Sequence, residues 1–253
     1  MKSMILAAGE GTRLRPHTLT RPKCLVEVEG KSLLDRQLEI LRSEGITENI
    51  IIGGYLAEML QGRGTRQYLN PRYNETNMVW TLFCAEEELE GDVIVTYGDI
   101  VYSADALRAL LADRSDIAVT IDLDWEEYWR ARLDDPLSDA ETLKLSGEGH
   151  ILELGKKPQS LDEIEGQYMG LMKFSAHGVQ QLKKVFRESS EKGFIQGKHP
   201  ENAYMTDLIQ EMIDRGCVVQ SVPVHGGWVE VDTVEDLESE VTKRRLVKIE
   251  RDF

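Results

Sequence analysis

Short apolar runs alternate with amphipathic stretches along the first half of the chain. The apolar runs are short enough for strands buried on both faces, and the amphipathic stretches have the spacing of helices. In one of them, Leu34, Leu38 and Leu41 fall on a single helical face, Ser32 can cap the start and Gly45 can end it. The pattern predicts strands at 4–7, 49–52, 92–97 and 116–121, and helices at 32–44, 77–89 and 103–112. This alternation is typical of an α/β fold with a mostly parallel sheet.

The second half has a different pattern. Two apolar stretches, 142–146 and 150–154, flank Gly147-Glu148-Gly149 and predict a hairpin. Further strands are expected at 170–174, 218–224 and 229–231, and helices at 178–190, 205–215 and 233–250. No internal repeat or flexible linker separates the halves, so we interpret 1–253 as one domain in which 122–253 adds elements that can cover a substrate.

Composition narrows the functional class. With 41% hydrophobic and 30% charged residues the chain is expected to fold. The 30 basic and 45 acidic side chains give 30 − 45 = −15, which disfavours nucleic acid as a partner. No apolar run approaches the roughly 18 residues of a membrane span, and the start does not resemble a secretion signal. Cys24, Cys84 and Cys217 form no CxxC pair. We therefore expect a cytoplasmic protein without membrane contact.

The most informative segment is a glycine loop directly after the first expected strand. It reads Leu6-Ala7-Ala8-Gly9-Glu10-Gly11-Thr12-Arg13-Leu14 and is followed by Arg21-Pro22-Lys23. Small residues at this place let backbone N–H groups approach a phosphate, to which Arg13 and Lys23 can add positive charge. The loop lacks the lysine of a P-loop, and leucine replaces the third glycine of a dinucleotide fingerprint. Taken alone, the loop also fits a purely structural turn.

The loop and the RPK triplet together resemble the signature of the nucleotidyltransferases that join a nucleoside triphosphate to a phosphorylated small molecule. The resemblance extends to Gly53-Gly54-Tyr55, to Tyr97-Gly98-Asp99 and to the W-x-E-x-D segment 228–232. It implies a Rossmann-like nucleotidyltransferase fold with a mixed, mostly parallel sheet flanked by helices and a small β/α insertion that covers the acceptor. In that reading 1–121 is the nucleotide-binding half and 122–253 is the acceptor-binding half.

The resemblance also implies the reaction, in which an acceptor oxygen attacks the α-phosphorus and pyrophosphate leaves. Lys23 and Arg13 would be the catalytic cations, and Asp99 and Asp232 would hold Mg²⁺. Helix capping is the alternative role for either aspartate. Nucleotide-binding residues would be Leu6, Ala7, Ala8, Gly9, Glu10, Gly11, Thr12, Arg13, Lys23, Thr81 and Gly98. Tight strand packing explains Ala7 and Ala8 equally well.

Residues 70–82 distinguish branches of this family. They lack the Q-P-x-G-L-A stretch of sugar-phosphate enzymes and instead carry Y-N-x-x-N-x-x-x-[ST]-L. This pattern resembles the phosphocholine cytidylyltransferases and their phosphonate-handling relatives. The later segments 122–132, 136–141, 154–158 and 167–171 resemble the cytidylyltransferases that activate 2-aminoethylphosphonate or a similar compound. CTP and a small phosphonate or phosphate acceptor are therefore the expected partners. The oligomeric state is left open, and a homodimer is compatible with the sequence. A sugar-1-phosphate nucleotidyltransferase using UTP, dTTP or GTP is the alternative enzyme, and a regulatory protein without catalysis is the non-enzymatic one.

The acceptor site is expected in the second half. An ammonium head group favours carboxylates or an aromatic cage. The candidates are Trp125, Trp129, Asp139, Glu141, Lys144, Lys156, Tyr168, Gly170 and Glu230. Core packing is the alternative for the tryptophans, a solvated loop for Asp139 and Glu141, and surface charge for the two lysines.

Overall fold

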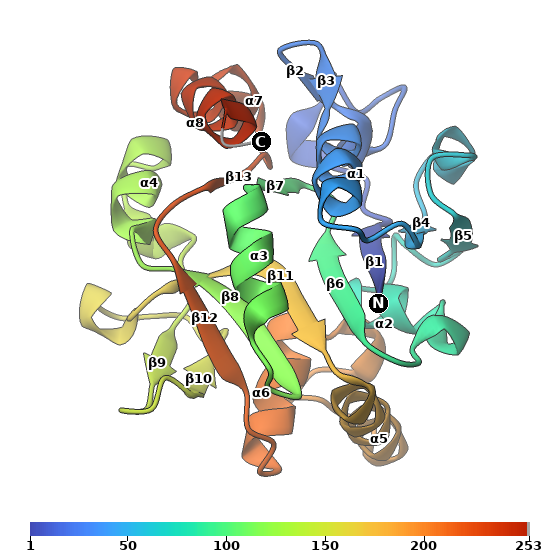
Figure 1. Cartoon of the computed structure of the whole chain (residues 1–253), viewed down its shortest axis with the longest axis vertical. Coiled ribbons are helices and arrows are strands. Elements are labelled where there is room, and N and C mark those ends of the chain that lie inside the picture. The colour runs from blue at the N-terminus through green and yellow to red at the C-terminus, as the bar shows by residue number, and fades with distance from the viewer. Residues whose placement is uncertain (252–253) are drawn as a thin grey trace.

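The computed structural model describes residues 1–251 and is built around one seven-stranded sheet (Figure 1). The strand order is β12-β8-β11-β6-β1-β4-β5. These strands are β1 (Lys2–Ala7), β4 (Asn49–Gly53), β5 (Arg66–Leu69), β6 (Val93–Tyr97), β8 (Ile117–Asp122), β11 (Gln167–Phe174) and β12 (Gln220–Val224). All neighbours are parallel except β11, which runs antiparallel to both β6 and β8. The expected α/β fold with a mixed, mostly parallel sheet is confirmed.

Both faces of the sheet are buried, which explains the nearly continuous apolar strands. In β1, Ile5 belongs to one hydrophobic core, whereas Met4 and Leu6 belong to the other. The first core includes apolar residues of α1 (Leu33–Ser43) and α3 (Ala104–Ala112), and the second includes those of α2 (Met78–Phe83), α5 (Ala176–Lys192) and α6 (Met205–Asp214). Figure 1 shows α3 crossing one face of the sheet. This two-sided burial fixes the carboxyl ends of β1 and β6 side by side.

Smaller ribbons complete the fold. β2 (Glu27–Val28) pairs with β3 (Lys31–Ser32), β9 (Leu143–Leu145) with β10 (Ile151–Leu154), and β7 (Ile100–Tyr102) with β13 (Trp228–Glu230). The β9–β10 pair is the predicted hairpin. α4 (Trp125–Arg132), α7 (Val234–Glu238) and α8 (Glu240–Arg251) contribute to the core that contains β13.

Two predicted helices are shorter than the sequence pattern indicated. The helix expected over 77–89 ends at Phe83, and Glu86–Glu88 form a separate 3-10 turn. In this turn the Glu88 carboxylate lies 3.0 Å from Nζ of Lys2. The helix expected over 233–250 divides at Ser239, whose ψ of 132° is extended. The Ser239 hydroxyl accepts from the N–H of Val241 at 3.1 Å and so begins a new helix.

No helix within 1–251 is both long and apolar enough to cross a bilayer.

Candidate active site

The glycine loop turns sharply at Gly11. Its φ of 61° is left-handed, and a Cβ there would lie 3.0 Å from Cβ of Lys23. The Thr18 hydroxyl donates to the Gly11 carbonyl at 2.8 Å and fixes the turn. Glycine therefore serves two purposes at this position, because it permits the backbone angle and leaves room for the Lys23 side chain.

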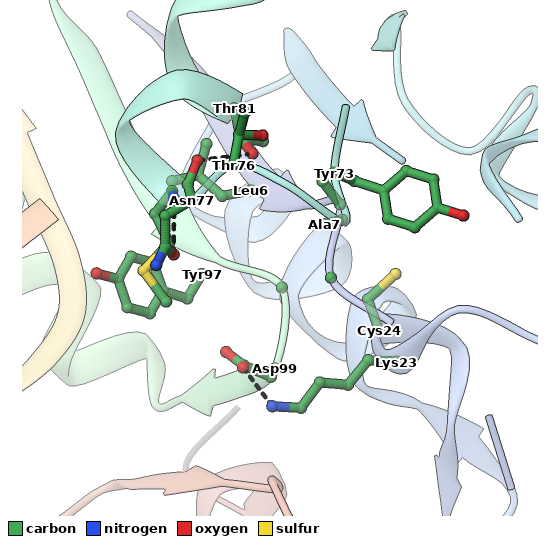
Figure 2. A pocket seen from close by; sticks show the side chains of 14 residues that line it. Leu6, Ala7, Lys23, Cys24, Tyr73, Thr76, Asn77, Thr81, Tyr97 and Asp99 are labelled. Atoms are coloured by element: carbon green, nitrogen blue, oxygen red, sulfur yellow. Dashed lines mark hydrogen bonds and ion pairs between the residues drawn. The ribbon is translucent and has the colours of Figure 1, made fainter. Parts of the chain in front are cut away.

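Lys23 lies between two carboxylates. Its Nζ donates to Asp99 at 2.6 Å and to Asp232 at 2.5 Å, and Arg13 forms an ion pair with the other oxygen of Asp232. Figure 2 shows Lys23 reaching toward Asp99. Burial lowers the pKa of Lys23, but the negative charges of Asp99 and Asp232 outweigh burial and hold that pKa above its ordinary value. Lys23 is therefore a fixed positive charge at neutral pH.

Backbone pairing brings the two aspartates together from distant parts of the chain. Asp99 follows β6 and precedes β7, while Asp232 follows β13. In the β7–β13 ladder Ile100 faces Glu230, and the Val231 N–H donates to the Asp99 carbonyl at 3.0 Å. This ladder explains how residues so far apart in sequence meet at one lysine.

The turn at Gly98 allows Asp99 to lie close to the glycine loop. The Gly98 N–H donates to the Leu6 carbonyl at 2.9 Å, and a Cβ on Gly98 would lie 3.0 Å from that oxygen. The buried Gln37 amide donates to the carbonyls of Tyr97 and Ile100 at 2.9 and 2.6 Å. The strand end that carries Asp99 is thus held from both sides.

The two aspartates are the predicted Mg²⁺ ligands, and carboxylate oxygens are the donors that this cation prefers. Oδ1 of Asp99 is buried and has no hydrogen-bond partner among residues 1–251, so it is free to bind a cation. Across the same residues, no cluster of three or more His, Cys, Asp or Glu side chains is arranged to hold a metal. Two hard oxygen donors from the protein suit Mg²⁺, which usually takes its other ligands from water and substrate phosphates.

A first pocket opens where β1 and β6 end. Of the predicted nucleotide-binding residues it is lined by Leu6, Ala7, Ala8, Gly9, Lys23, Thr81 and Gly98. The predicted metal ligand Asp99 also lines it. Glu10, Gly11, Thr12 and Arg13 lie outside its wall, and Glu10 binds Arg15 at 3.2 Å. Its walls bring the backbone of the glycine loop, the lysine and one aspartate into a single cavity.

Sequence reasoning missed one wall of the first pocket. Tyr73, Thr76, Asn77, Met78 and Tyr97 also line it, and Figure 2 shows Thr76, Asn77 and Thr81 grouped together. Asn77 caps α2 by accepting from the Met78 N–H at 2.9 Å. The Thr81 hydroxyl accepts from Asn70 at 3.0 Å. The Y-N-x-x-N-x-x-x-[ST]-L pattern contained this signal, because it spans the residues that build the wall.

A second pocket adjoins the first, and Met78 and Tyr97 line both. Its lining includes six predicted acceptor residues together with Arg13 and Asp232. The six are Trp129, Asp139, Glu141, Tyr168, Gly170 and Glu230. Burial raises the pKa of Glu141 to about 7, the charges of Asp207 and Asp139 raise it, and Lys198 opposes them. The lining of the second pocket therefore includes several acidic side chains, Asp139, Glu141, Glu230 and Asp232.

Three predicted acceptor residues lie outside the second pocket. Trp125 is buried and packs edge-on against Trp129, with ring centroids 6.3 Å apart. Lys144 and Lys156 lie on or beside the β9–β10 hairpin, where their ammonium groups are 3.5 and 2.7 Å from Glu153. These contacts are those of the alternatives, core packing and surface ion pairing, and an acceptor role for the three residues stays a prediction.

Arg132 supports the second pocket from behind. Its buried guanidinium donates to Asp236 at 2.8 and 3.0 Å and to Glu230 at 3.1 Å. Asp236 in turn accepts from the N–H of Asp232 at 3.1 Å. Burial raises the pKa of Glu230 above its ordinary value, although the Arg132 charge opposes the rise. A single arginine on α4 thus links the acidic wall to the segment that carries Asp232.

Known proteins resemble this chain in sequence and in fold. The profile of the MobA-like NTP transferase domain matches residues 3–193. The CTP:phosphoglutamine cytidylyltransferase of Campylobacter jejuni is 38% identical over 254 residues, covering 96% of this chain and 100% of that protein. The choline-phosphate cytidylyltransferase of Streptococcus pneumoniae is 42% identical over 99 residues, covering 38% of this chain and 43% of that protein.

A solved structure extends the comparison to the whole fold. The inositol-1-phosphate CTP transferase of T. maritima superposes with a TM-score of 0.75 at 21% identity, covering 98% of this chain and 96% of that one. The fold is therefore shared across nearly the full length. Together with the profile match and the full-length relative, these findings show that the chain belongs to the MobA-like NTP transferase family and is a nucleotidyltransferase.

Proposed function

We propose that this protein is a Mg²⁺-dependent cytidylyltransferase that transfers CMP from CTP to a small phosphate- or phosphonate-bearing acceptor with an ammonium head group. The observation that carries the proposal is the position of Lys23, which joins Asp99 and Asp232 where the two pockets meet. The first pocket then receives the nucleotide and the second receives the acceptor.

The proposed chemistry depends on charge and positioning. An ionised oxygen of the acceptor attacks the α-phosphorus, the bond to the bridging oxygen breaks, and pyrophosphate leaves with that oxygen. Because the nucleophile is already an anion, no general base is needed. Lys23 stabilises the negative charge that develops on the α-phosphate, and Arg13 attracts the leaving phosphates. Asp99 and Asp232 would hold Mg²⁺, which supplies further charge stabilisation to phosphate oxygens when it is bound.

Support for CTP comes from the relatives. Both curated relatives described above are named as cytidylyltransferases, and one of them aligns over nearly the entire chain. Their named acceptors, phosphoglutamine and choline phosphate, both carry a nitrogen cation. The acidic side chains of Asp139, Glu141 and Glu230 in the second pocket suit such a head group.

Pyrophosphate release tests this proposal directly. The enzyme is incubated with CTP, Mg²⁺ and either phosphoglutamine, phosphocholine, phosphoethanolamine, 2-aminoethylphosphonate or glucose-1-phosphate. UTP, dTTP, GTP and ATP replace CTP in parallel reactions. We expect release with CTP and an ammonium-bearing acceptor. Release with glucose-1-phosphate alone, or with another nucleotide alone, would contradict the proposed acceptor or the proposed nucleotide, respectively.

A further inference from the structure

The aromatic side chains of the second pocket are already engaged with one another and with protein cations. Trp129 and Trp228 are buried, with ring centroids 5.9 Å apart. The Arg132 guanidinium lies 5.1 Å from the Trp129 ring centroid. Nζ of Lys198 lies 4.4 Å from the centroid of the Tyr204 ring. Since a cation over an aromatic face satisfies that face, these rings are poorly placed to cage a trimethylammonium group.

The two remaining tyrosines of the pocket contact each other. Tyr97 and Tyr168 meet edge to face, with centroids 5.8 Å apart, and the Tyr168 hydroxyl lies 3.3 Å from that of Tyr97. The aromatic part of the pocket is therefore a packed wall. Recognition of a charged head group falls to the polar side chains.

Two residues that line this pocket, Gln167 and Trp129, each have a buried polar atom without a hydrogen-bond partner within residues 1–251, and the indole N–H of Trp129 is the donor of the two. Gln167, at the start of β11, is 5% exposed, and its Oε1 has no hydrogen-bond partner within residues 1–251. A buried amide oxygen is unfavourable unless water or a ligand supplies a donor. A ligand that displaces such a water must therefore itself carry N–H or O–H groups.

The charge of the pocket lining indicates which kind of N–H or O–H group the ligand carries. Among residues 1–251, its charged lining consists of Asp139, Glu141, Glu230 and Asp232 and one cation, Arg13, which is paired with Asp232. Lys198, whose charge acts on Glu141, forms its own ion pair with Asp207 at 2.7 Å. A ligand group that is both positively charged and rich in N–H donors satisfies Gln167 and the acidic lining together.

Building on the proposed function, we propose that the acceptor ends in a primary ammonium group bound by the Gln167 amide oxygen and the Glu141 carboxylate. Gln167 is then a specificity-determining residue. A quaternary ammonium has the same charge but no N–H donor, so it leaves the Gln167 oxygen unsatisfied. Gln167 thus favours binding of primary over quaternary ammonium head groups.

The test compares acceptors that differ only at nitrogen. One pair is phosphoethanolamine and phosphocholine, and the other is phosphoglutamine and its Nα-trimethyl derivative, each assayed with CTP. We expect the wild-type kcat/KM to favour the primary member of a pair by at least about tenfold, as the loss of a hydrogen bond to a buried group implies. Equal or better turnover of the quaternary members in both pairs would overturn the proposal.

A variant tests the role of Gln167 itself. Gln167→Met keeps the side-chain length and removes the amide, so it should lower kcat/KM for the primary acceptor at least about tenfold and change the quaternary one by less than about twofold. Met169→Leu alters the same wall without changing polarity and should leave the preference intact. An equal loss on both acceptors would mean a merely structural role and would overturn the proposal.

Two further readouts keep the result interpretable. CTP binding is measured by calorimetry without acceptor. If CTP binds and CMP is transferred only to glucose-1-phosphate, the primary-ammonium inference is overturned while the cytidylyl transfer stands, whereas loss of CTP binding contradicts the proposed function. Should Gln167→Met fail to fold, Gln167→Glu retains a hydrogen-bond acceptor and must keep the preference for the primary head group.

Discussion

The two pockets lie side by side but are built differently. The first is lined by short segments at the ends of β1 and β6 and at the start of α2, among them Ala7, Ala8, Gly9 and Gly98. The second draws side chains from Arg13 to Asp232 and depends on an arginine that does not line it. The first can therefore be read from motifs. The second depends on tertiary contacts that no local pattern contains.

The comparison predicts the largest effect at Lys23, where the pockets meet. Lys23→Ala should lower kcat by about 10³-fold, at the upper end of the range for removal of a group that stabilises transition-state charge. The free energy of unfolding should also fall, because the variant leaves two mostly buried carboxylates, Asp99 and Asp232, without this cation. Steady-state kinetics and thermal unfolding measure both. Lys243→Ala, which removes an exposed partner of Glu240, is the control. Near-normal turnover would exclude a catalytic role for Lys23.

Arg132 tests whether the second pocket depends on support from behind. Arg132→Met leaves Asp236 and Glu230 without their cation and should cost about 3 kcal/mol of unfolding free energy, the low end for a broken buried pair because Glu230 is partly exposed. Urea denaturation measures the loss.

The matched control for Arg132 lies on the same helix. Arg130→Met removes an exposed i,i+4 pair with Glu126 and should cost less than about 0.5 kcal/mol. Equal losses in the two variants would contradict a supporting role for Arg132.

Replacing a proposed metal ligand should change how activity depends on the Mg²⁺ concentration. Asp99→Asn should raise the Mg²⁺ concentration for half-maximal activity at least about tenfold and lower kcat, because one anionic ligand is lost. The measurement is a Mg²⁺ titration of pyrophosphate release at saturating CTP. An unchanged titration curve would place the metal elsewhere.

The smallest effect concerns pH. Burial raises the pKa of Glu141 to about 7, so the free enzyme loses this negative charge as pH falls through that value. KM for an ammonium acceptor should therefore rise several-fold between about pH 8 and pH 6, and KM for CTP should not follow it. The acceptor phosphate also titrates near pH 6, so the useful quantity is the ratio between wild type and Glu141→Gln. A ratio that is constant with pH would remove Glu141 from acceptor binding.

Much of the fold followed from the sequence pattern because the central strands are buried on both faces and their apolar runs are unambiguous. Met4 and Ile5, for example, enter opposite cores. The ends of helices were harder to predict from the sequence. The helix ends after Phe83 and at Ser239 are accompanied by individual side-chain contacts of Glu88 and Ser239.

The site divides in the same way. Lys23, Asp99 and Asp232 could be predicted from motifs. The β7–β13 ladder then brings the two aspartates together. Trp125 and Trp129 are four residues apart on one helix, yet only Trp129 of the two lines the second pocket. The sequence does not contain the orientation of α4, which determines this difference. The supporting contacts of Arg132 and the unpartnered oxygen of Gln167 could not be predicted from a local pattern, since the partners of Arg132 lie far away in sequence and that of Gln167 is absent from the protein.

The β7–β13 ladder also has a consequence for synthesis of the enzyme. Asp99 and the glycine loop leave the ribosome long before Asp232, and the ladder that aligns the two carboxylates cannot form until residues 228–230 have been made. A chain terminated before this segment keeps the lysine and the first pocket but lacks half of the carboxylate pair. Prematurely ended products are therefore expected to be catalytically silent, even where the first part of the sheet has already folded.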